Sequence, residues 1–323
     1  MRSVVGRYAL SNCVAAAMLA SCGGSQPPIG APSAMPQTST LATHADRGKS
    51  WMAPGARKSD PWLYVTGNGS NNVVIYDLVQ SGFPELGTIT NGVSSPAGVT
   101  VDASGQVYVA NESGTVTIYP PGKTSPRLTL SDDLSQPQSV AVDANGNVYV
   151  CDRGNSPAIV VFPPGESTPS QVITNDLIQI PNQVQFDAAG DLYYSDNNTG
   201  VSEIPAGYQS MSSLNLQGLQ STRGLALDHY GNLYVGTCCK PGFDGAREYV
   251  PGDEQPVRSL HDSEGSDIYA SGVVKKNQYI FLPDSYNSTV RAFIPNTRKP
   301  AFVINTADAQ TSVGVAVKPA GIP

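Results

Sequence analysis

One turn motif recurs at regular spacing along the chain, and this repeat constrains the fold more than any other feature. Each copy places a short apolar stretch before Asp-x-x-Gly and a second apolar stretch of the Val-Tyr-Val type directly after it. The copies centre on Asp102, Asp143, Asp187 and Asp228, which are 41, 44 and 41 residues apart. A period near 42 residues accommodates four short strands, which is the spacing of blades in a β-propeller.

The motif indicates a tight turn between two strands of one blade. Asp at the first turn position can accept hydrogen bonds from the turn backbone, and Gly at the fourth tolerates a positive φ. The Val-Tyr-Val stretch is apolar on both faces, as expected for a strand sandwiched between neighbouring blades. A third strand, closed by a Pro-rich turn, and a fourth, more polar strand complete each unit, and the polar strand would protect the outer edge.

Two degenerate copies flank these four and predict how the ring closes. Residues 62–90 contain counterparts of the second, third and fourth strands but not of the first, and residues 266–305 lack the Asp-x-x-Gly turn. The missing first strand reappears at residues 313–317, which read Val-Gly-Val-Ala-Val. The sequence therefore predicts an all-β fold over residues 60–323, a six-bladed β-propeller with its C-terminal strand closing the first blade.

These repeats resemble those of NHL-type propellers, which are six-bladed proteins. The resemblance covers about residues 60–318. It implies the architecture but little about activity, because this fold hosts hydrolases, lyases, ligand binders and protein scaffolds.

The N-terminal segment has a different composition and indicates export. Arg2 and Arg7 precede an apolar run, residues 8–20, that is too short to cross a bilayer. The run ends in Leu19-Ala20-Ser21-Cys22, which resembles the lipobox of bacterial lipoproteins. The resemblance implies that residues 1–21 are a signal peptide and that Cys22 is lipidated; the alternative is an ordinary signal with a chance cysteine. Residues 22–59, rich in Gly, Ser and Pro, are predicted to be a disordered tether, so we expect a membrane-anchored protein of the bacterial cell envelope, periplasmic or surface-facing.

The loops between the second and third strands vary in length, and we predict that they form the ligand face. Four of them begin with a carboxylate or an amide, at Asn111, Asp152, Asp196 and Asp284. One interpretation is an oxygen-ligand site for Ca²⁺ or another divalent cation, as in gluconolactonase-like propellers, to which the chain is distantly similar. The other is that each residue caps its own loop. Recurrence with the repeat favours capping, so no metal and no cofactor is assigned.

Cysteine and histidine offer few further candidates. Cys238 and Cys239 are adjacent in the longest variable loop, and in an exported protein we expect them to form a disulfide with each other. The alternatives are pairing with Cys151 or three free thiols. His229 and His261 have no nucleophile partner in the sequence and are interpreted as surface residues, whereas the third histidine, His44, lies in the low-complexity segment before the propeller.

Charge and motifs restrict the possible functions. The formal net charge of -7 argues against a nucleic-acid partner, and no catalytic residue is assigned, because the sequence contains no phosphate-binding loop, nucleophile elbow or zinc-protease motif. We therefore expect a membrane-tethered, non-catalytic binding or scaffold module for an unknown protein or small molecule. The alternative is a metal-dependent lactonase-like hydrolase or a propeller-type lyase acting on a small molecule.

Overall fold

The computed structural model describes residues 49–318, apart from residues 58, 208–209, 239–244, 261–273, 277, 295–296 and 298. All of them fall within one compact unit, His44–Pro323. The regular structure of this described part consists of 25 β-strands and contains no helix. None of the described segments is therefore a helix of the length and apolarity needed to cross a bilayer.

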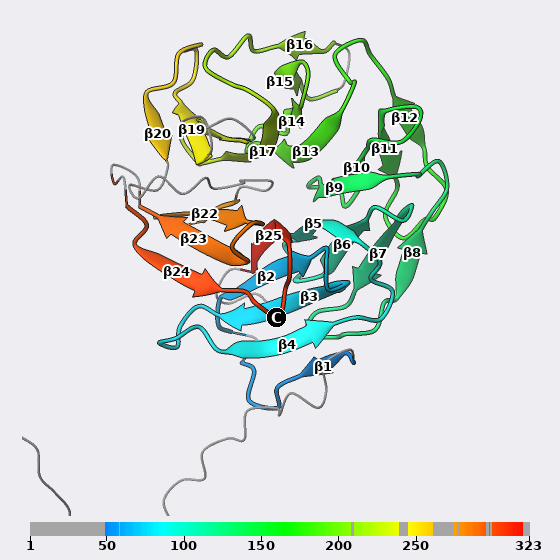
Figure 1. The fold of residues 1–323 in the computed structure, drawn as a ribbon. Helices are drawn as coiled ribbons and strands as arrows, with labels where there is room; N and C mark the ends of the chain where they lie inside the picture. The colour runs from blue at the N-terminus through cyan, green and yellow to red at the C-terminus, as the bar shows by residue number, and fades with distance from the viewer. Residues whose placement is uncertain are drawn as a thin grey trace, which may run out of the picture. The chain divides into compact units, whose positions relative to one another are not determined.

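The strands form six antiparallel sheets arranged as blades around a centre (Figure 1). Blade one joins the end of the chain to its beginning, in the order β25 (Ser312–Lys318), β2 (Trp62–Gly67), β3 (Asn72–Asp77), β4 (Glu85–Ile89) and β1 (Trp51–Met52). Blade two is β5 (Pro96–Val101), β6 (Val107–Asn111), β7 (Thr115–Tyr119) and β8 (Leu128–Leu130). Blade three is β9 (Pro137–Val142), β10 (Val148–Asp152), β11 (Ala158–Phe162) and β12 (Gln171–Ile173).

The remaining three blades follow the same order, from the inner strand to the outer one. Blade four is β13 (Pro181–Phe186), β14 (Leu192–Asp196), β15 (Gly200–Ile204) and β16 (Ser212–Ser213). Blade five is β17 (Thr222–Leu227), β18 (Leu233–Thr237), β19 (Gly245–Tyr249) and β20 (Arg258–Leu260). Blade six is β21 (Val274–Lys276), β22 (Tyr279–Asp284), β23 (Thr289–Phe293) and β24 (Phe302–Asn305). The predicted six-bladed propeller is confirmed.

The Asp-x-x-Gly motifs form the predicted turns between first and second strands. In blade two, Asp102 Oδ1 accepts the amides of Ser104 at 2.8 Å and Gln106 at 2.9 Å, and Gly105 has a φ of +85°. Asp143, Asp187 and Asp228 hold their turns in the same way. We call this end of the blades the turn end. The opposite end, where second strands lead into third strands, is the mouth end.

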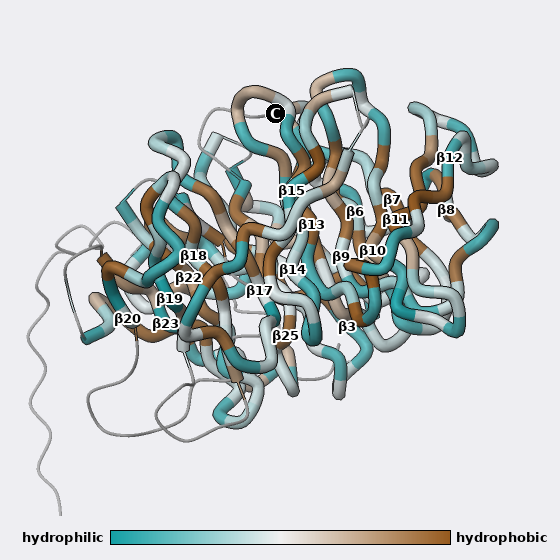
Figure 2. Tube along the Cα trace, turned by 90° about the horizontal axis from the view of Figure 1, so that it is seen from above, coloured by the Kyte–Doolittle hydropathy of each residue, from teal (hydrophilic) through white to brown (hydrophobic). Residues whose placement is uncertain are grey.

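The hydrophobic core lies between the faces of adjacent blades. One cluster brings Tyr108 and Ile118 of blade two against Val150 and Phe162 of blade three, all nearly or fully buried. In Figure 2 the hydrophobic stretches follow the strands, and the hydrophilic stretches gather in the loops. Burying each large apolar side chain contributes roughly 1.5–3 kcal/mol, so each blade is stabilised mainly by its neighbours.

The ring closes through the C-terminal strand, as predicted. β25 pairs antiparallel with β2, with Val315 opposite Val65 and Val317 opposite Leu63. The Thr66 hydroxyl accepts the amide of Gly314 at 2.7 Å and donates to the carbonyl of Ala97 in blade two at 3.2 Å. The last strand thus completes the sheet of the first blade and connects it to the second.

The predicted tether, residues 22–59, needs one correction. Residues Trp51 and Met52 form β1, which pairs with Thr88 and Gly87 at the outer edge of blade one. The Ser50 hydroxyl adds a hydrogen bond from the amide of Thr90, at 2.8 Å. A two-residue strand in a Pro- and Gly-rich segment has no alternation to detect, and its role is to cover an otherwise open sheet edge.

Candidate functional site

The predicted ligand-face residues lie at the mouth end, where their side chains hold their own blades together. Asp152 Oδ1 accepts the amides of Ser135 at 3.0 Å and Gln136 at 2.6 Å, from the loop that leads into β9. Asp196 is fully buried. Its Oδ2 accepts two amides of the loop before β13, at 2.7 and 2.6 Å, and its Oδ1 accepts those of Asn198 and Thr199.

Asn111 and Asp284, the other two predicted ligand-face residues, are held in related ways. Asn111 Oδ1 accepts the amide of Ser94 at 3.0 Å, from the loop before β5. Asp284 Oδ2 accepts from the Asn287 amide group at 2.8 Å and pairs with the Arg291 guanidinium at 3.2 Å. All four side chains therefore hold loops in place. Asp196 and Asp284 accept amides of their own hairpin loops, as the second interpretation predicts, whereas Asn111 and Asp152 accept amides of the loop that leads into the inner strand. Within the described ranges, no group of three or more His, Cys, Asp or Glu side chains is arranged to hold a metal ion.

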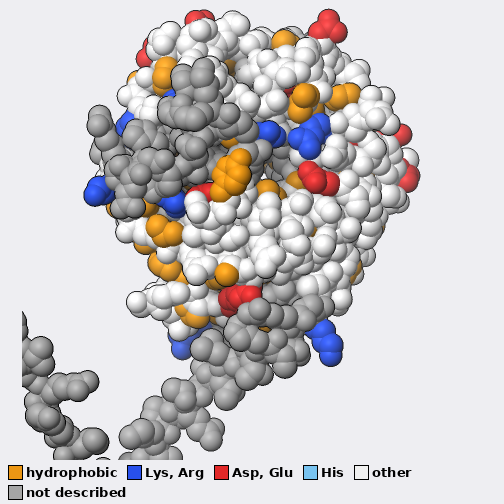
Figure 3. All heavy atoms as spheres, viewed as in Figure 1, with side chains coloured by type: hydrophobic (Ala, Val, Ile, Leu, Met, Phe, Trp, Pro, Cys, Tyr) orange, Lys and Arg blue, Asp and Glu red, His pale blue; other side chains and the backbone are white. Residues whose placement is uncertain are grey.

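Residues at the start of the loops that follow second strands form a polar rim around the central channel. Asn68, Glu112, Arg153 and Asn197 each come directly after the mouth end of a second strand. Side chains from the second residue of an inner strand lie beside them, namely Gln138, Asn182 and Arg223. We call these seven residues the mouth ring. Figure 3 shows basic side chains beside a central hollow on one face of the molecule, with an acidic side chain close to them.

The mouth ring surrounds two adjoining pockets above the channel. The central pocket has a volume of about 190 Å³ and includes Glu112, Arg153 and Arg223 in its wall. The lateral pocket, of about 440 Å³, is bounded by residues of blades three and four and by Arg223 of blade five. Arg153 and Arg223 line both pockets.

Glu112 is the acidic member of the ring and is held by three neighbours. Its Oε1 accepts from Gln138 Nε2 at 3.1 Å, and its Oε2 accepts from Asn68 Nδ2 at 3.3 Å. The Arg153 guanidinium lies 3.6 Å from Oε1, and both side chains are about a quarter exposed. An ion pair of this length and exposure contributes little to stability, so Arg153 can turn to another anion at small cost.

Arg223 is positioned from two sides. Its Nε donates to Cys238 Sγ at 3.4 Å, and its Nη1 donates to Asn182 Oδ1 at 3.5 Å. Asn182 is itself anchored, because its Nδ2 donates to the carbonyl of Thr222 at 2.9 Å. The side-chain oxygen Oδ1 of Asn197, a residue in the wall of the lateral pocket, is buried and has no hydrogen-bond partner among the described residues.

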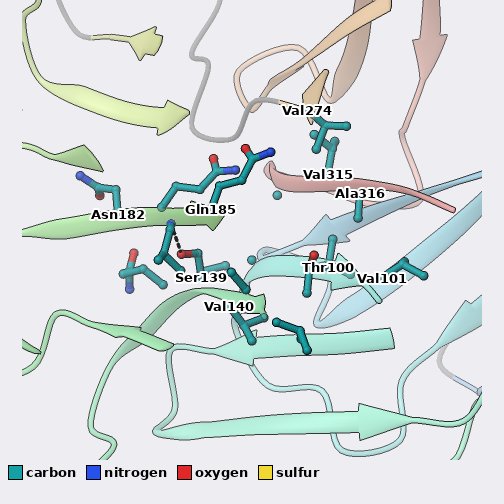
Figure 4. Close-up of a pocket in the computed structure, with 18 of the residues that line it drawn as sticks. Thr100, Val101, Ser139, Val140, Asn182, Gln185, Val274, Val315 and Ala316 are labelled. Atoms are coloured by element: carbon teal, nitrogen blue, oxygen red, sulfur yellow. Dashed lines mark hydrogen bonds between the residues drawn. The ribbon is translucent and has the colours of Figure 1, made fainter. Parts of the chain in front are cut away.

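Below the mouth, the inner strands enclose a channel cavity of about 260 Å³. Figure 4 shows Thr100, Ser139 and Gln185 around this cavity, on the inner strands of blades two, three and four. Several of its polar side chains connect adjacent blades. Ser139 Oγ accepts the amide of Val184 at 3.0 Å, and Gln185 Oε1 accepts the amide of Leu227 at 3.3 Å. The inner strand edges are thus paired across blades, which fixes the channel wall.

The structure describes only some of the cysteines and histidines considered in the sequence. Cys22, Cys239, His44 and His261 are outside the described residues. Cys238 is disulfide-bonded, whereas Cys151 is a free, buried thiol. The pairing of Cys238 with Cys239 stays a prediction. His229 lies in a turn-end loop, where its ring is 3.7 Å from that of Tyr230.

Sequence reasoning overlooked the mouth ring because it followed the positions that recur. Asn68, Glu112, Arg153 and Asn197 occupy the same position in successive blades but differ in residue type. The sequence signal that could have identified the mouth ring is the first residue after each second strand, because its residue type changes from blade to blade while the neighbouring positions recur.

Comparisons with known proteins agree with this architecture. Residues 134–156 match the NHL repeat, a segment that contains β9, β10 and the cap between Asp152 and its two amides. A search of curated proteins finds no match. Among solved structures, a chain from the crystal structure of a nidogen/laminin complex superposes with a TM-score of 0.68 at 17% identity, over 80% of this chain and 98% of that one. At this identity the likeness shows the fold alone.

Proposed function

We propose that this protein is a membrane-tethered, non-catalytic binding module of the bacterial cell envelope that recognises its ligand at the channel mouth. The observation that carries this proposal is the mouth ring: Glu112, Arg153 and Arg223 stand among amide side chains above a pre-formed cavity. Binding sites are usually concave and carry a few convergent polar groups. The ring is also built on strand ends, which hold side chains more firmly than free loops.

The roles of the capping residues support binding rather than chemistry. Asp152 and Asp196 are 2% and 0% exposed, and both accept several backbone hydrogen bonds within their own blades. Carboxylates used in this way stabilise the scaffold that carries the ring. The architecture is also compatible with protein recognition, since a chain of the same fold comes from a nidogen/laminin complex.

The anchor is proposed from the sequence. Leu19-Ala20-Ser21-Cys22 follows an apolar run, and a lipidated Cys22 would precede about 28 residues before β1 begins at Trp51. A flexible segment of that length spans roughly 30 Å. We expect metabolic labelling with a fatty-acid probe to modify the wild-type protein and to fail in Cys22→Ala, which should also leave the membrane fraction. Labelling of the variant at the wild-type level would contradict the anchor.

A metal analysis followed by a lactone and ester hydrolysis screen tests the binding role on the full-length protein. We expect no stoichiometric metal and no turnover above the rate of an Arg153→Gln, Arg223→Gln double variant. A bound divalent metal, together with hydrolysis that is lost on chelation, would favour the lactonase-like alternative and overturn the proposal.

A further inference from the structure

We propose that Asn91 is a site of spontaneous deamidation, and that its conversion releases the edge strand β1 from blade one. Asn91 is followed by Gly92, and glycine has no side chain to hinder attack of its amide nitrogen on the preceding Asn. The chain contains three such Asn-Gly steps, at residues 68–69, 91–92 and 145–146. Asn91 lies outside both mouth pockets, so its chemistry is independent of the proposed ligand.

The reaction needs only the two residues of the step and water. The Gly92 amide nitrogen loses its proton to solvent base and attacks the side-chain carbonyl carbon of Asn91. The new N–C bond closes a succinimide ring, and the side-chain nitrogen takes up a proton and leaves as ammonia. Water then opens the ring at the side-chain carbonyl to give aspartate, or at the main-chain carbonyl to give isoaspartate. No oxidant or reductant takes part.

The glycine amide must be free to act as the nucleophile, and at two of the three steps it is held. The Gly69 amide donates to the carbonyl of Gln310 at 3.0 Å. The Gly146 amide donates to the carbonyl of Asp143, also at 3.0 Å. Each of these hydrogen bonds has to break before the nitrogen can reach the preceding side chain, which slows the reaction at both steps.

The Gly92 amide, in contrast, is available. No acceptor for it is found in the described part of the chain. The turn formed by residues 90–93 is closed by the next amide, that of Val93, which donates to the carbonyl of Thr90 at 3.2 Å. Both Asn91 and Gly92 are exposed, so solvent base and water reach the step directly.

The three Asn side chains differ in how firmly they are held. Asn68 is half-buried, and its Nδ2 donates to Glu112 at 3.3 Å. The side chain of Asn91 has a single contact, from Nδ2 to Ser125 Oγ at 3.5 Å, which is at the limit of a hydrogen bond. Asn145 is as exposed as Asn91, and it therefore isolates the effect of the glycine amide.

The fold requires glycine at position 92. Gly92 has a φ of +76°, a backbone conformation that L-residues rarely adopt. A Cβ at this position would also lie 3.2 Å from the side chains of both Pro126 and Thr117 in blade two. The turn therefore keeps an Asn-Gly step that a bulkier second residue would protect.

Asn91 lies where β1, blade one and blade two meet. Ser50 Oγ, directly before β1, accepts the amides of Thr90 at 2.8 Å and Asn91 at 2.9 Å. Tyr119 of blade two donates to the Asn91 carbonyl at 2.6 Å. Isoaspartate lengthens the main chain by one carbon and displaces this carbonyl. Because β1 has only two residues and lies at the rim of blade one, beside β4 (Figure 1), the shift at Ser50 is enough to free it.

Timed incubation of the full-length protein in mildly alkaline, heavy-oxygen water tests the proposal, with mass spectrometry of peptides that resolve the three steps. Products formed during the incubation carry heavy oxygen, so earlier conversion is not counted. In the native protein we expect Asn91 to react about tenfold faster than Asn145 or Asn68, because only the other two glycine amides must first break a hydrogen bond. In urea the three steps should react at similar rates.

Hydrogen exchange measures the release of β1. The Ala53 amide, directly after β1, donates to the carbonyl of Leu86 at 2.7 Å, and it should exchange faster in proportion to the isoaspartate formed at residue 91. Asn91→Gln should prevent both the reaction and the faster exchange. Freshly prepared Asn91→Asp adds the charge without lengthening the main chain and should exchange like wild type. Melting temperatures verify that both variants are folded.

Three results would overturn the proposal. A native reaction at Asn145 or Asn68 as fast as that at Asn91 would refute the assignment of the site. The native order of rates persisting in urea would show that sequence, and not the glycine hydrogen bonds, sets the order. Full conversion of Asn91 to isoaspartate with unaltered exchange at Ala53 would refute the release of β1.

Discussion

The two ends of the blades use the same chemistry, a carboxylate or amide oxygen that accepts backbone amides, over very different distances in sequence. At the turn end, Asp187 accepts the amides of Ala189 and Asp191, two and four residues further on. At the mouth end of the same blade, Asp196 accepts amides from residues 179 and 180, which are 17 and 16 positions earlier. The first interaction needs only a hairpin, whereas the second needs the blade to be assembled.

The difference explains why one end is uniform and the other carries the candidate site. A local turn tolerates only the residues that make it, so four of the six blades repeat Asp-x-x-Gly. A buried cap at the mouth end holds the strand ends from below and leaves the next residue exposed to the channel. That next residue can be Glu112, Arg153 or Asn197 without loss of the fold.

We expect the largest loss of stability from removing the contact that joins the most distant parts of the sequence, the pairing of β25 with β2. Deleting residues 311–323 removes β25, which pairs with β2 along the whole inner edge of blade one. It also removes the Gly314 amide that donates to the Thr66 hydroxyl, and the apolar contacts of Val315. We expect loss of the cooperative melting transition and aggregation through the open edge.

Deleting residues 319–323 alone leaves β25 intact and serves as the matched control, with an expected melting curve like that of wild type. Calorimetry and light scattering measure both truncations. An unchanged melting temperature in the longer deletion would show that closure does not stabilise the ring.

Removing a capping side chain at the mouth end should lower the free energy of unfolding more than removing the Asp of a turn-end motif. Asp196→Ala leaves four backbone amides without their acceptor inside a fully buried site. We expect the free energy of unfolding to fall by about 3 kcal/mol, measured by urea denaturation. Asp196→Asn keeps one carbonyl acceptor and should lose less, so an equal loss in both variants would indicate that charge, not hydrogen bonding, is responsible.

The corresponding change at the turn end of the same blade gives the contrast. Asp187→Ala removes the acceptor of two amides, at 2.9 and 2.8 Å, in a partly exposed turn where water can replace it. We expect a loss of about 1 kcal/mol, again by urea denaturation. A loss as large as that of Asp196→Ala would remove the distinction between the two ends.

The smallest effect is a change in labelling rate in blade three. Burial raises the pKa of Cys151 to about 12, and this thiol directly precedes the cap Asp152. Because the pKa of Cys151 in the folded protein exceeds the ordinary thiol value of 9.0, the neutral thiol contributes stability below pH 9 that is lost as the pH rises toward 12. At pH 8, iodoacetamide should label native Cys151 on the order of a thousandfold more slowly than the unfolded chain.

Mass spectrometry of the peptide that contains Cys151 follows this reaction. Asp152→Ala should accelerate labelling, because the mouth end of β10 opens more often, whereas Asp143→Ala at the turn end should not. Equal acceleration in both variants would indicate that the thiol responds to global unfolding only.

The sequence predicts this fold well because the same strand and turn motifs recur from blade to blade. Asp-x-x-Gly and Val-Tyr-Val identify two strands in each of four blades, and the strand missing before Trp62 locates closure at residues 313–317. The mouth ring could not be predicted in the same way. Arg153 and Arg223 lie on different blades and at different strand positions, and only the ring brings them into one pocket. The edge strand at Trp51 was overlooked because it has two residues.

The closure by β25 also sets an order of events during synthesis. Blades two to six are each built from consecutive segments and can form as the chain leaves the ribosome, because their contacts are local. Blade one contains the earliest strands of the ring, yet it waits for Ser312–Lys318, almost 250 residues after β2. The blade that is made first is therefore completed last, and until then its inner edge is the surface on which a nascent chain is open to misassembly.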